Sequence, residues 1–150
     1  MHGACDNRQL QRQDFLHTIA RPVVGGGWCV LLQEAGVRGD VAGEYLGQAI
    51  FEDELKSRLR TRGDNDLYFA HLVGEVYLDA THMGSYMRFV NHSCDPNARL
   101  ELMVVDSERR LEVRLTRPTR KWEELTINYG KVAGNGLTVS CYCLAAACLG

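Results

Sequence analysis

Half of the chain's cysteines lie in its last ten residues, and this spacing constrains the fold more than any other feature. The six cysteines are Cys5, Cys29, Cys94, Cys141, Cys143 and Cys148. The terminal segment CYCLAAAC spaces its thiols two and seven positions apart, which allows them to close around one Zn²⁺. A structural zinc takes four ligands, so the sequence predicts that the fourth comes from elsewhere in the chain.

Cys94 is the best-placed candidate for this fourth ligand. It lies in the polar turn RFVNHSCDPNA, whereas Cys29 lies within an apolar strand-like run and Cys5 lies near the start of the chain. The alternative is three incidental cysteines in an alanine-rich tail, but a Cys-x-Cys pair with a third thiol close by is uncommon without a metal. A disulfide framework is the weaker interpretation, because the first twenty residues contain no visible secretory signal.

The turn that carries Cys94 also holds Asn91 and His92. Pro96 fixes its own φ and pushes Asp95 toward an extended conformation, so the turn has a defined shape. A Cys–His nucleophilic pair, a metal ligand and a polar turn that binds a small molecule all fit these residue types. If Cys94 binds zinc, its thiolate is committed to the metal, and His92 has no obvious orienting partner. Both points weaken the hydrolase interpretation.

Composition is typical of a soluble globular domain. The 150 residues are 45% hydrophobic and 24% charged, which suits one domain. The net charge of −2 argues against a dedicated nucleic-acid binder and suits a protein or peptide partner. No apolar run approaches the ~18 residues that span a bilayer. We therefore expect a soluble, intracellular protein with no membrane partner.

The hydrophobic pattern predicts a mostly-β domain with one short helix. The helix is predicted over 52–60, where acids begin the segment and Leu55 and Leu59 lie one turn apart. Residues 1–13 are polar with no core of their own, and 131–140 form a loop into the cysteine segment. The predicted strands are short, with a bend expected within the third, and cover residues 15–20, 28–32, 41–50, 67–73, 76–80, 98–105, 111–116 and 125–130.

The segments together resemble a SET-domain protein lysine methyltransferase with a post-SET zinc segment. The most specific pieces are NHSCDPN, the downstream ELTINYG and the terminal Cys-x-Cys-x4-Cys, and the upstream pieces follow in the family's order as GGGW, GEYLGQAI, YF, LDA and GSYMRFVNHSC. CDNRQLQRQ resembles the end of the cysteine-rich AWS segment found in the group that acts on nucleosomes over transcribed genes. Only the last cysteine of that segment, Cys5, is present, so we expect the chain to come from a longer protein.

The resemblance implies an architecture and a domain organisation. We expect short curved sheets, one or two short helices, a threaded, knot-like active site and a C-terminal zinc segment. The expected boundaries are an AWS-like remnant at 1–13, a SET domain at 14–130 and a post-SET zinc segment at 131–150.

The resemblance also implies an activity. We expect a histone-lysine N-methyltransferase that moves a methyl group from S-adenosylmethionine to a lysine amine, yields S-adenosylhomocysteine and holds one structural zinc. The expected substrate is a histone tail or nucleosome, met in the nucleus on the chromosome by a monomeric catalytic domain without sequence-specific nucleic-acid binding. Two rivals are methylation of a non-histone protein and a catalytically silent SET module that binds chromatin.

The resemblance assigns roles to particular residues. It makes Tyr129 the central catalytic tyrosine and Tyr45 a wall of the lysine channel. The zinc ligands that it implies are Cys94, Cys141, Cys143 and Cys148. The implied cofactor-binding residues are Gly26, Gly27, Trp28, Tyr68, Arg88, Phe89, Asn91, His92 and Tyr142. Glycine is expected in the GGGW loop because a Cβ there would collide with the cofactor.

Several positions depart from the family pattern, and they bear on rate and product state more than on the chemistry. Ile127 replaces the aromatic residue usually found two positions before the catalytic tyrosine. A smaller side chain there predicts a roomier pocket and at least a dimethylated product. The other departures are Cys29, Gln48, Ser85, Met87, Asn128 and Leu144.

Overall fold

The computed structural model describes residues 8–62, 68–130 and five residues of the C-terminal segment, namely Cys141, Cys143, Ala145, Ala146 and Cys148. The described helical elements are α1 (Arg8–Arg12), α2 (Glu52–Arg62) and the 3₁₀ turn η1 (Tyr86–Phe89). The described strands are β1 (Thr18–Pro22), β2 (Trp28–Leu32), β3 (Val41–Tyr45), β4 (Gly47–Phe51), β5 (Phe69–Val73), β6 (Val76–Gly84), β7 (Asn91–His92), β8 (Ala98–Val105), β9 (Glu108–Leu115) and β10 (Thr126–Ile127). The mostly-β prediction is confirmed.

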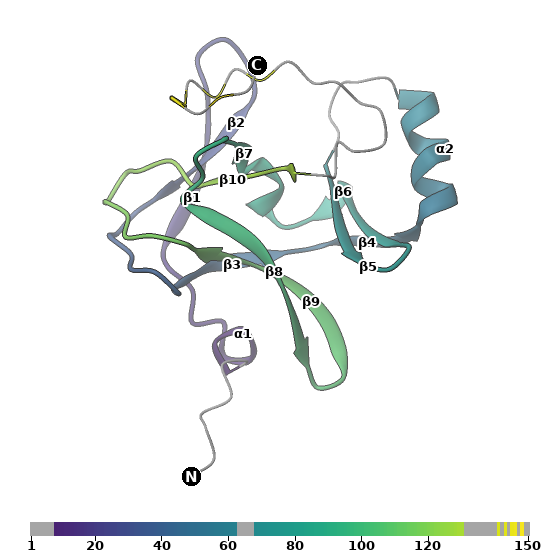
Figure 1. Ribbon diagram of the computed structural model, residues 1–150, viewed down its shortest axis with the longest axis horizontal. Coiled ribbons are helices and arrows are strands. Elements are labelled where there is room, and N and C mark those ends of the chain that lie inside the picture. Colours follow the sequence, from purple (N-terminus) through teal and green to yellow (C-terminus); the bar gives the residue numbers. More distant parts are fainter. Residues whose placement is uncertain are drawn as a thin grey trace.

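The described strands form four small sheets. β1 pairs with β2, β3–β9–β8 and β4–β6–β5 are three-stranded, and β7 pairs with β10. The β7–β10 pair is parallel, and the pairings in the other three sheets are antiparallel. Figure 1 shows the β8–β9 hairpin extending from the middle of the molecule toward α1, while α2 lies beside the β4–β6–β5 sheet. The threaded, knot-like course implied by the family resemblance stays a prediction.

The bend expected within residues 41–50 divides that segment into two strands of different sheets. β3 ends at Tyr45 and β4 begins at Gly47. A Cβ on Gly47 would lie 2.8 Å from the carbonyl carbon of Asp79 in β6. The chain therefore turns its corner so close to a neighbouring backbone that glycine is required there.

The β8–β9 hairpin has a shorter turn than the sequence predicted. Asp106 and Ser107 both have positive φ, 51° and 69°, as in a two-residue hairpin turn of primed type. The next three residues, 108–110, were expected in the loop, but they pair with β8 and extend β9. The strand was not predicted over these residues because their side chains are charged and show no apolar alternation. Backbone hydrogen bonds form the ladder there.

The N-terminal helix α1 was not predicted, and it buries Leu10 against the rest of the domain rather than in a core of its own. Leu10 is only 1% exposed. The Gln11 amide also donates to the carboxylate of Asp106 at 3.2 Å, which connects α1 to the tip of the β8–β9 hairpin. A five-residue helix is too short to be stable on propensity alone, so it depends on this tertiary contact. Among the described helices, none has the length and apolarity needed to cross a membrane.

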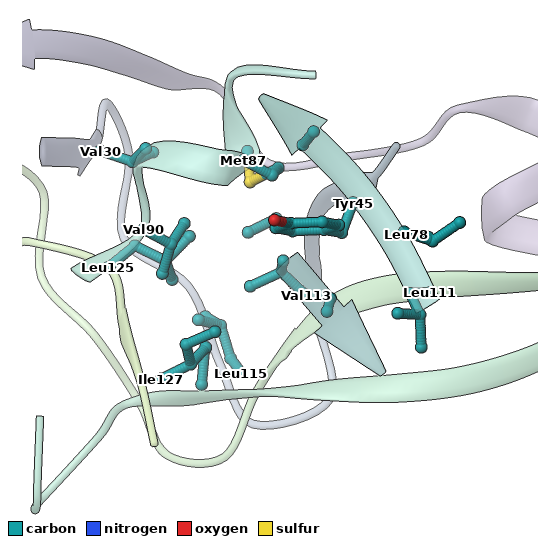
Figure 2. Close-up of a cluster of buried hydrophobic side chains, with 14 residues drawn as sticks. Val30, Tyr45, Leu78, Met87, Val90, Leu111, Val113, Leu115, Leu125 and Ile127 are labelled. Carbon is teal, nitrogen blue, oxygen red and sulfur yellow. The ribbon is translucent and has the colours of Figure 1, made fainter. Parts of the chain in front are cut away.

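The hydrophobic core lies between the two three-stranded sheets and η1. In Figure 2 the ring of Tyr45 reaches into the cluster between Met87 and Val113. Met87 has room because a Cβ on Gly43 would lie only 2.7 Å from its Cε atom. The larger residue at position 87, which departs from the family pattern, is thus accommodated by a glycine on β3.

One buried ion pair attaches α2 to the sheet beneath it. Arg58 donates to Asp79, whose side chain is 1% exposed, and also to the Gln48 amide oxygen at 3.1 Å. Burial alone would raise the pKa of Asp79, but hydrogen bonds from Thr81 and the Arg58 charge outweigh it and hold that pKa below its ordinary value. Gln48, on β4, therefore gives the Arg58 guanidinium a second hydrogen-bond acceptor.

Candidate functional site

The parallel pairing of β7 and β10 brings the NHSC turn beside the ELTINYG segment. Asn91 lies opposite Thr126, and His92 lies opposite Ile127. The backbone N–H of Ser93 extends this ladder by donating to the Ile127 carbonyl at 2.9 Å. Two segments that are distant in sequence thus pair as one small parallel sheet.

The side chain of Asn97, which is buried, fixes the approach of β10. Its Oδ1 accepts from the Thr126 backbone N–H at 2.9 Å, and its Nδ2 donates to the Glu124 carbonyl at 2.8 Å and to the Glu123 carboxylate at 3.0 Å. A buried amide with both ends bonded specifies one arrangement of these segments. The sequence reasoning did not single out Asn97, although it follows Pro96 in the same turn.

Asn91 connects the turn to the start of β2. Its Nδ2 donates to the Trp28 carbonyl at 2.9 Å and to the Glu124 carboxylate at 2.8 Å. Glu124 begins the ELTINYG segment, but the sequence assigned it no role of its own. The Asn91 side chain therefore holds the backbone of Trp28, the last residue of GGGW, beside the NHSC turn.

Four of the predicted cofactor residues form one aromatic and cationic surface. Trp28 stacks on Phe89 with ring centroids 5.3 Å apart, and Tyr68 meets Phe89 edge-on at 5.8 Å. The Arg88 guanidinium lies 4.7 Å from the Phe89 ring centroid and donates to the Ala80 carbonyl at 2.8 Å. Trp28 is 45% exposed, so one side of this stack remains open. An open aromatic face next to a cation can accept a planar ring.

The glycine loop before β2 needs glycine for a conformational reason, and the predicted collision of a Cβ with the cofactor stays a prediction. Gly26 and Gly27 have φ of +111° and +84°. A Cβ on either would meet nothing within 4 Å. Within the described chain the requirement is therefore conformational, since L side chains rarely adopt these angles.

The two predicted catalytic tyrosines lie close enough to interact electrostatically. Burial, then Tyr129 and Asp79, raise the pKa of the Tyr45 phenol. Burial, then Tyr68 and Glu124, raise the pKa of Tyr129 to about 12. The Tyr129 hydroxyl donates to the Val90 carbonyl at 2.9 Å. Both phenols are therefore neutral at physiological pH.

Ser85 connects η1 to the bend between β3 and β4. Its hydroxyl donates to the Glu44 carbonyl at 2.6 Å and accepts from the Leu46 backbone N–H at 3.3 Å. This residue departs from the family pattern, yet it satisfies two backbone groups next to Tyr45. Of the other departures, Asn128 accepts from the Gly130 backbone N–H at 2.7 Å, and Leu144 lies outside the described residues.

The cysteines predicted to bind zinc are brought together in space. Cys94 Sγ lies 3.8 Å from Cys141 Sγ, and the Cys94 backbone N–H donates to Cys143 Sγ at 3.4 Å. Four ligands at the usual Zn–S distance of about 2.3 Å would hold sulfur atoms about 3.8 Å apart. The thiol of Cys148 lies 3.9 Å from the Cys141 carbonyl oxygen. The backbone N–H of Cys148 donates to the Ala145 carbonyl and closes the turn. This donor set fits a zinc ion.

Electrostatics also favour a thiolate at this cluster. Hydrogen bonds from the backbone N–H groups of Cys94 and Ala145 lower the pKa of Cys143 to about 6. Cys29 is buried on β2, where burial, then Glu124, raise its pKa. The sequence was therefore right to set Cys29 apart from the cluster. Cys5 and Tyr142 lie outside the described residues.

His92 contacts the same cluster. Its Nε2 lies 3.4 Å from Cys94 Sγ, and its Nδ1 accepts from the Tyr129 backbone N–H at 3.0 Å. A metal-binding group of His92, Cys94, Cys141 and Cys143 has its ligand atoms within 4.8 Å of one another. The sequence considered His92 and Cys94 as a nucleophilic pair and the family resemblance assigned His92 to the cofactor, whereas the structure shows its contact with the cysteine cluster.

Comparison with known proteins identifies a family to which the chain is similar. The SET domain family model matches residues 27–130. The chain is 30% identical over 149 residues to the histone-lysine N-methyltransferase ASHH3 of Arabidopsis thaliana, covering 96% of the chain and 40% of that relative. It is 30% identical over 152 residues to the H3 lysine-36 specific histone-lysine N-methyltransferase of Homo sapiens, covering 99% of the chain and 6% of that relative.

Solved structures agree with the family match. The structure of ctPRC2 in an autoinhibited conformation bound to S-adenosylmethionine superposes with a TM-score of 0.76 and 28% identity, covering 85% of this chain and 17% of that one. The Chaetomium thermophilum Polycomb Repressive Complex 2 bound to GSK126 gives the same TM-score of 0.76 over 85% of the chain. The chain spans less than half the length of the relatives named here. By its family match, its relatives and its fold, the chain belongs to the SET-domain family.

Proposed function

We propose that the protein is a histone-lysine N-methyltransferase that uses S-adenosylmethionine. The observation that carries the proposal is the placement of Tyr129. Its backbone N–H is bonded to His92 and its hydroxyl to the Val90 carbonyl, at 3.0 and 2.9 Å. Tyr129 is nevertheless 43% exposed, so a neutral phenol in a fixed position can be reached by an incoming side chain. The relatives' names, which describe histone-lysine N-methyltransferases, support the same activity.

A lysine amine must lose its proton before it can accept a methyl group. Its pKa in water is ~10.4. In the proposed approach the amine comes between buried Tyr45 and Tyr129, where loss of water would favour its neutral form. A neutral phenol oxygen can accept one amine N–H and thereby orient the nitrogen lone pair. The residues thus act chiefly by desolvation and positioning, without a strong base.

The aromatic surface and the glycine loop are the proposed cofactor-binding residues. S-adenosylmethionine, when bound, supplies an electrophilic methyl group on a sulfonium sulfur. The open face of the Trp28–Phe89 stack suits its adenine ring, and the loop at Gly26 and Gly27 is exposed, with nothing within 4 Å of where a Cβ would lie, so the rest of the cofactor can approach its backbone. Tyr68 and Arg88 belong to this surface and Asn91 is bonded to the Trp28 carbonyl beside it, whereas His92 and Tyr142 are assigned to the cofactor by family resemblance alone.

The proposed metal is one structural zinc held by Cys94, Cys141, Cys143 and Cys148. The sulfur spacing and the thiolate-stabilising N–H groups at Cys143 support it. This zinc would connect the C-terminal segment to the turn that follows β7. The proposed organisation is an AWS-like remnant at 1–13, a SET domain at 14–130 and a post-SET segment at 131–150.

The proposed substrate is a histone tail presented on a nucleosome, which places the protein on chromatin in the nucleus. The test is incubation of nucleosomes and of separate histones with radiolabelled S-adenosylmethionine. We expect label in a histone band, and at most a trace of label with Tyr129→Phe at equal protein concentration. Label only in non-histone proteins of a nuclear extract would identify the rival substrate class. Cofactor binding without any transfer would identify a silent module.

A further inference from the structure

The cysteine cluster has five candidate ligands for a metal that takes four. Cys94, Cys141 and Cys143 are common to both choices. The fourth is either His92, whose ring nitrogen lies within 4.8 Å of the three sulfur atoms, or Cys148, which lies beside Cys141. Distance alone does not decide between them.

The hydrogen bond at Nδ1, the ring nitrogen of His92 that faces away from Cys94, decides which residue is the fourth ligand. The Tyr129 backbone N–H points at Nδ1 at 3.0 Å. A backbone N–H can only donate, so Nδ1 must offer its lone pair. A neutral imidazole with a lone pair on Nδ1 carries its proton on Nε2. Nε2 therefore presents an N–H, and a protonated ring nitrogen cannot bind a metal.

The atom that faces this Nε2–H is the sulfur of Cys94, at 3.4 Å. That separation suits an N–H···S hydrogen bond. A thiolate bound to zinc retains negative charge and accepts such a bond well. The Cys94 backbone N–H is already used, because it donates to Cys143. His92 is thus the side-chain donor that the structure places against the Cys94 sulfur.

We propose that His92 is a hydrogen-bond donor to the Cys94 thiolate, that Cys148 completes the zinc site, and that His92 thereby couples the zinc to the backbone of Tyr129. The proposal rests on the zinc site proposed above. It makes His92 a positioning residue: Tyr129 N–H bonds to the ring, and the ring bonds to a zinc-bound sulfur. Loss of zinc would remove the charge that orients the ring and so weaken the bond that holds Tyr129.

The ligand set can be read directly in the unaltered protein. We would replace zinc with ¹¹³Cd and record its chemical shift, which separates four-sulfur from three-sulfur, one-nitrogen coordination, and would confirm the donors by zinc-edge X-ray absorption. We expect four sulfur ligands. Three sulfurs with one nitrogen coupled to a His92 ring proton would overturn the proposal. Protein that binds no metal in either form would instead refute the zinc site itself.

The tautomer and the coupling need separate measurements. Long-range ¹H–¹⁵N spectra of histidine-labelled protein should show His92 protonated at Nε2, and a proton at Nδ1 would overturn the proposal. Next, the rate of zinc loss to a chromogenic chelator would be compared among variants. Because outer-shell partners are worth about 10–100-fold in metal affinity, His92→Phe should release zinc faster by that order. His92→Gln, which keeps one acceptor and one donor, should recover part of the loss.

A matched control is His71→Phe. His71 lies on β5, where its ring contacts the Gly74 carbonyl at 2.8 Å and the ring of Tyr77. We expect this variant to release zinc at the unaltered rate. Release from His92→Phe at that same rate would contradict the coupling. Should His92→Phe fail to fold, as judged by circular dichroism, the spectra of the unaltered protein still decide the ligand set and the tautomer.

Discussion

The Tyr129 hydroxyl donates a hydrogen bond to the carbonyl of Val90, 2.9 Å away. Val90 is the residue before β7, and Tyr129 is the second residue after β10, so this bond closes the same parallel pair whose ladder joins Asn91 to Thr126. Tyr129 is consequently fixed at both its backbone and its phenol. The position of this oxygen is set by the fold before any substrate arrives, which is what preorganised catalysis requires.

Removing this oxygen should lower methyl transfer while leaving the fold intact. Tyr129→Phe keeps the ring and its contact with His92, whose centroid lies 5.4 Å away. One group positioned in a transition state is worth roughly a hundredfold in rate or more. We therefore expect turnover to fall by that order, with affinity for S-adenosylhomocysteine nearly unchanged by calorimetry. Unaltered turnover would place the catalytic role elsewhere.

The pH–rate profile should show no ionisation of Tyr129 below about pH 10. Burial raises the pKa of Tyr129 to about 12, so its phenol keeps its proton throughout the working range. Any rise in rate between pH 7 and pH 10 then reports the lysine amine. Tyr129→Phe should lower the rate by the same factor at each pH in that range. A pH-dependent factor would mean that the phenol titrates in the active enzyme.

Asp79→Asn should destabilise the protein at neutral pH and do so less in acid. Asp79 is buried with Arg58, and breaking such a pair costs about 3 kcal/mol. Because the folded-state pKa of Asp79 is lowered, its contribution is present above its unfolded pKa and is lost as pH falls through the folded value. Urea unfolding at pH 7 and at pH 3 would measure this.

The control for Asp79 is an exposed pair on the same helix. Lys56 and Glu52 lie 3.0 Å apart on the surface of α2. Lys56→Gln should change stability far less than Asp79→Asn, because solvent screens an exposed ion pair. If both variants cost the same at pH 7, the Arg58–Asp79 pair does not anchor α2.

Cys143→Ala should remove zinc and weaken cofactor binding together. Cys143 accepts the Cys94 N–H, so its loss separates the C-terminal segment from the turn after β7. Elemental analysis should show one zinc per unaltered chain and a large loss in the variant. Cys29→Ala is the matched control, since Cys29 is buried on β2 and should retain zinc. Active protein without zinc would contradict the role of the cluster.

Ile127 should permit more than one methyl transfer. Its side chain is 5% exposed and belongs to the same buried cluster as Tyr45 (Figure 2). Hydrophobic pockets discriminate one methyl by only about 1–3 kcal/mol, so a mixture with at least dimethyl-lysine is expected. Ile127→Tyr should shift product toward monomethyl-lysine. Since a larger residue can strain a packed core, its melting temperature must be checked. Monomethyl product alone from the unaltered protein would contradict this.

The fold was predictable where the pattern is local and less so where tertiary contacts decide. The strand at 28–32 was predicted with its observed bounds, because WCVLL is an apolar run after glycine. Residues 41–50 were predicted as one bent element, and the division at Gly47 depends on the approach of β6. The short helix around Leu10 was missed because its burial, not its propensity, stabilises it.

The candidate site was likewise predictable where residue types follow a local pattern and not where tertiary contacts decide. The zinc prediction used residue types at fixed spacing, and the structure brings Cys94 within 3.8 Å of Cys141. The roles of Asn97 and Glu124, which orient the turn, were missed, because an ordinary polar residue becomes informative only when its hydrogen bonds are seen. The His92–Cys94 contact was considered as a nucleophilic pair, but the ring's bond to Tyr129 could not be read from the sequence.

The most direct test of the account is mass spectrometry of histones after reaction with S-adenosylmethionine carrying a trideuterated methyl group. Nucleosomes would be incubated with the unaltered protein and, in parallel, with Tyr129→Phe. We expect deuterated methyl groups on a lysine side chain of a histone tail with the unaltered protein, and at most a trace with the variant. A histone without label at long reaction times, from protein that is folded, loaded with zinc and able to bind the cofactor, would contradict it.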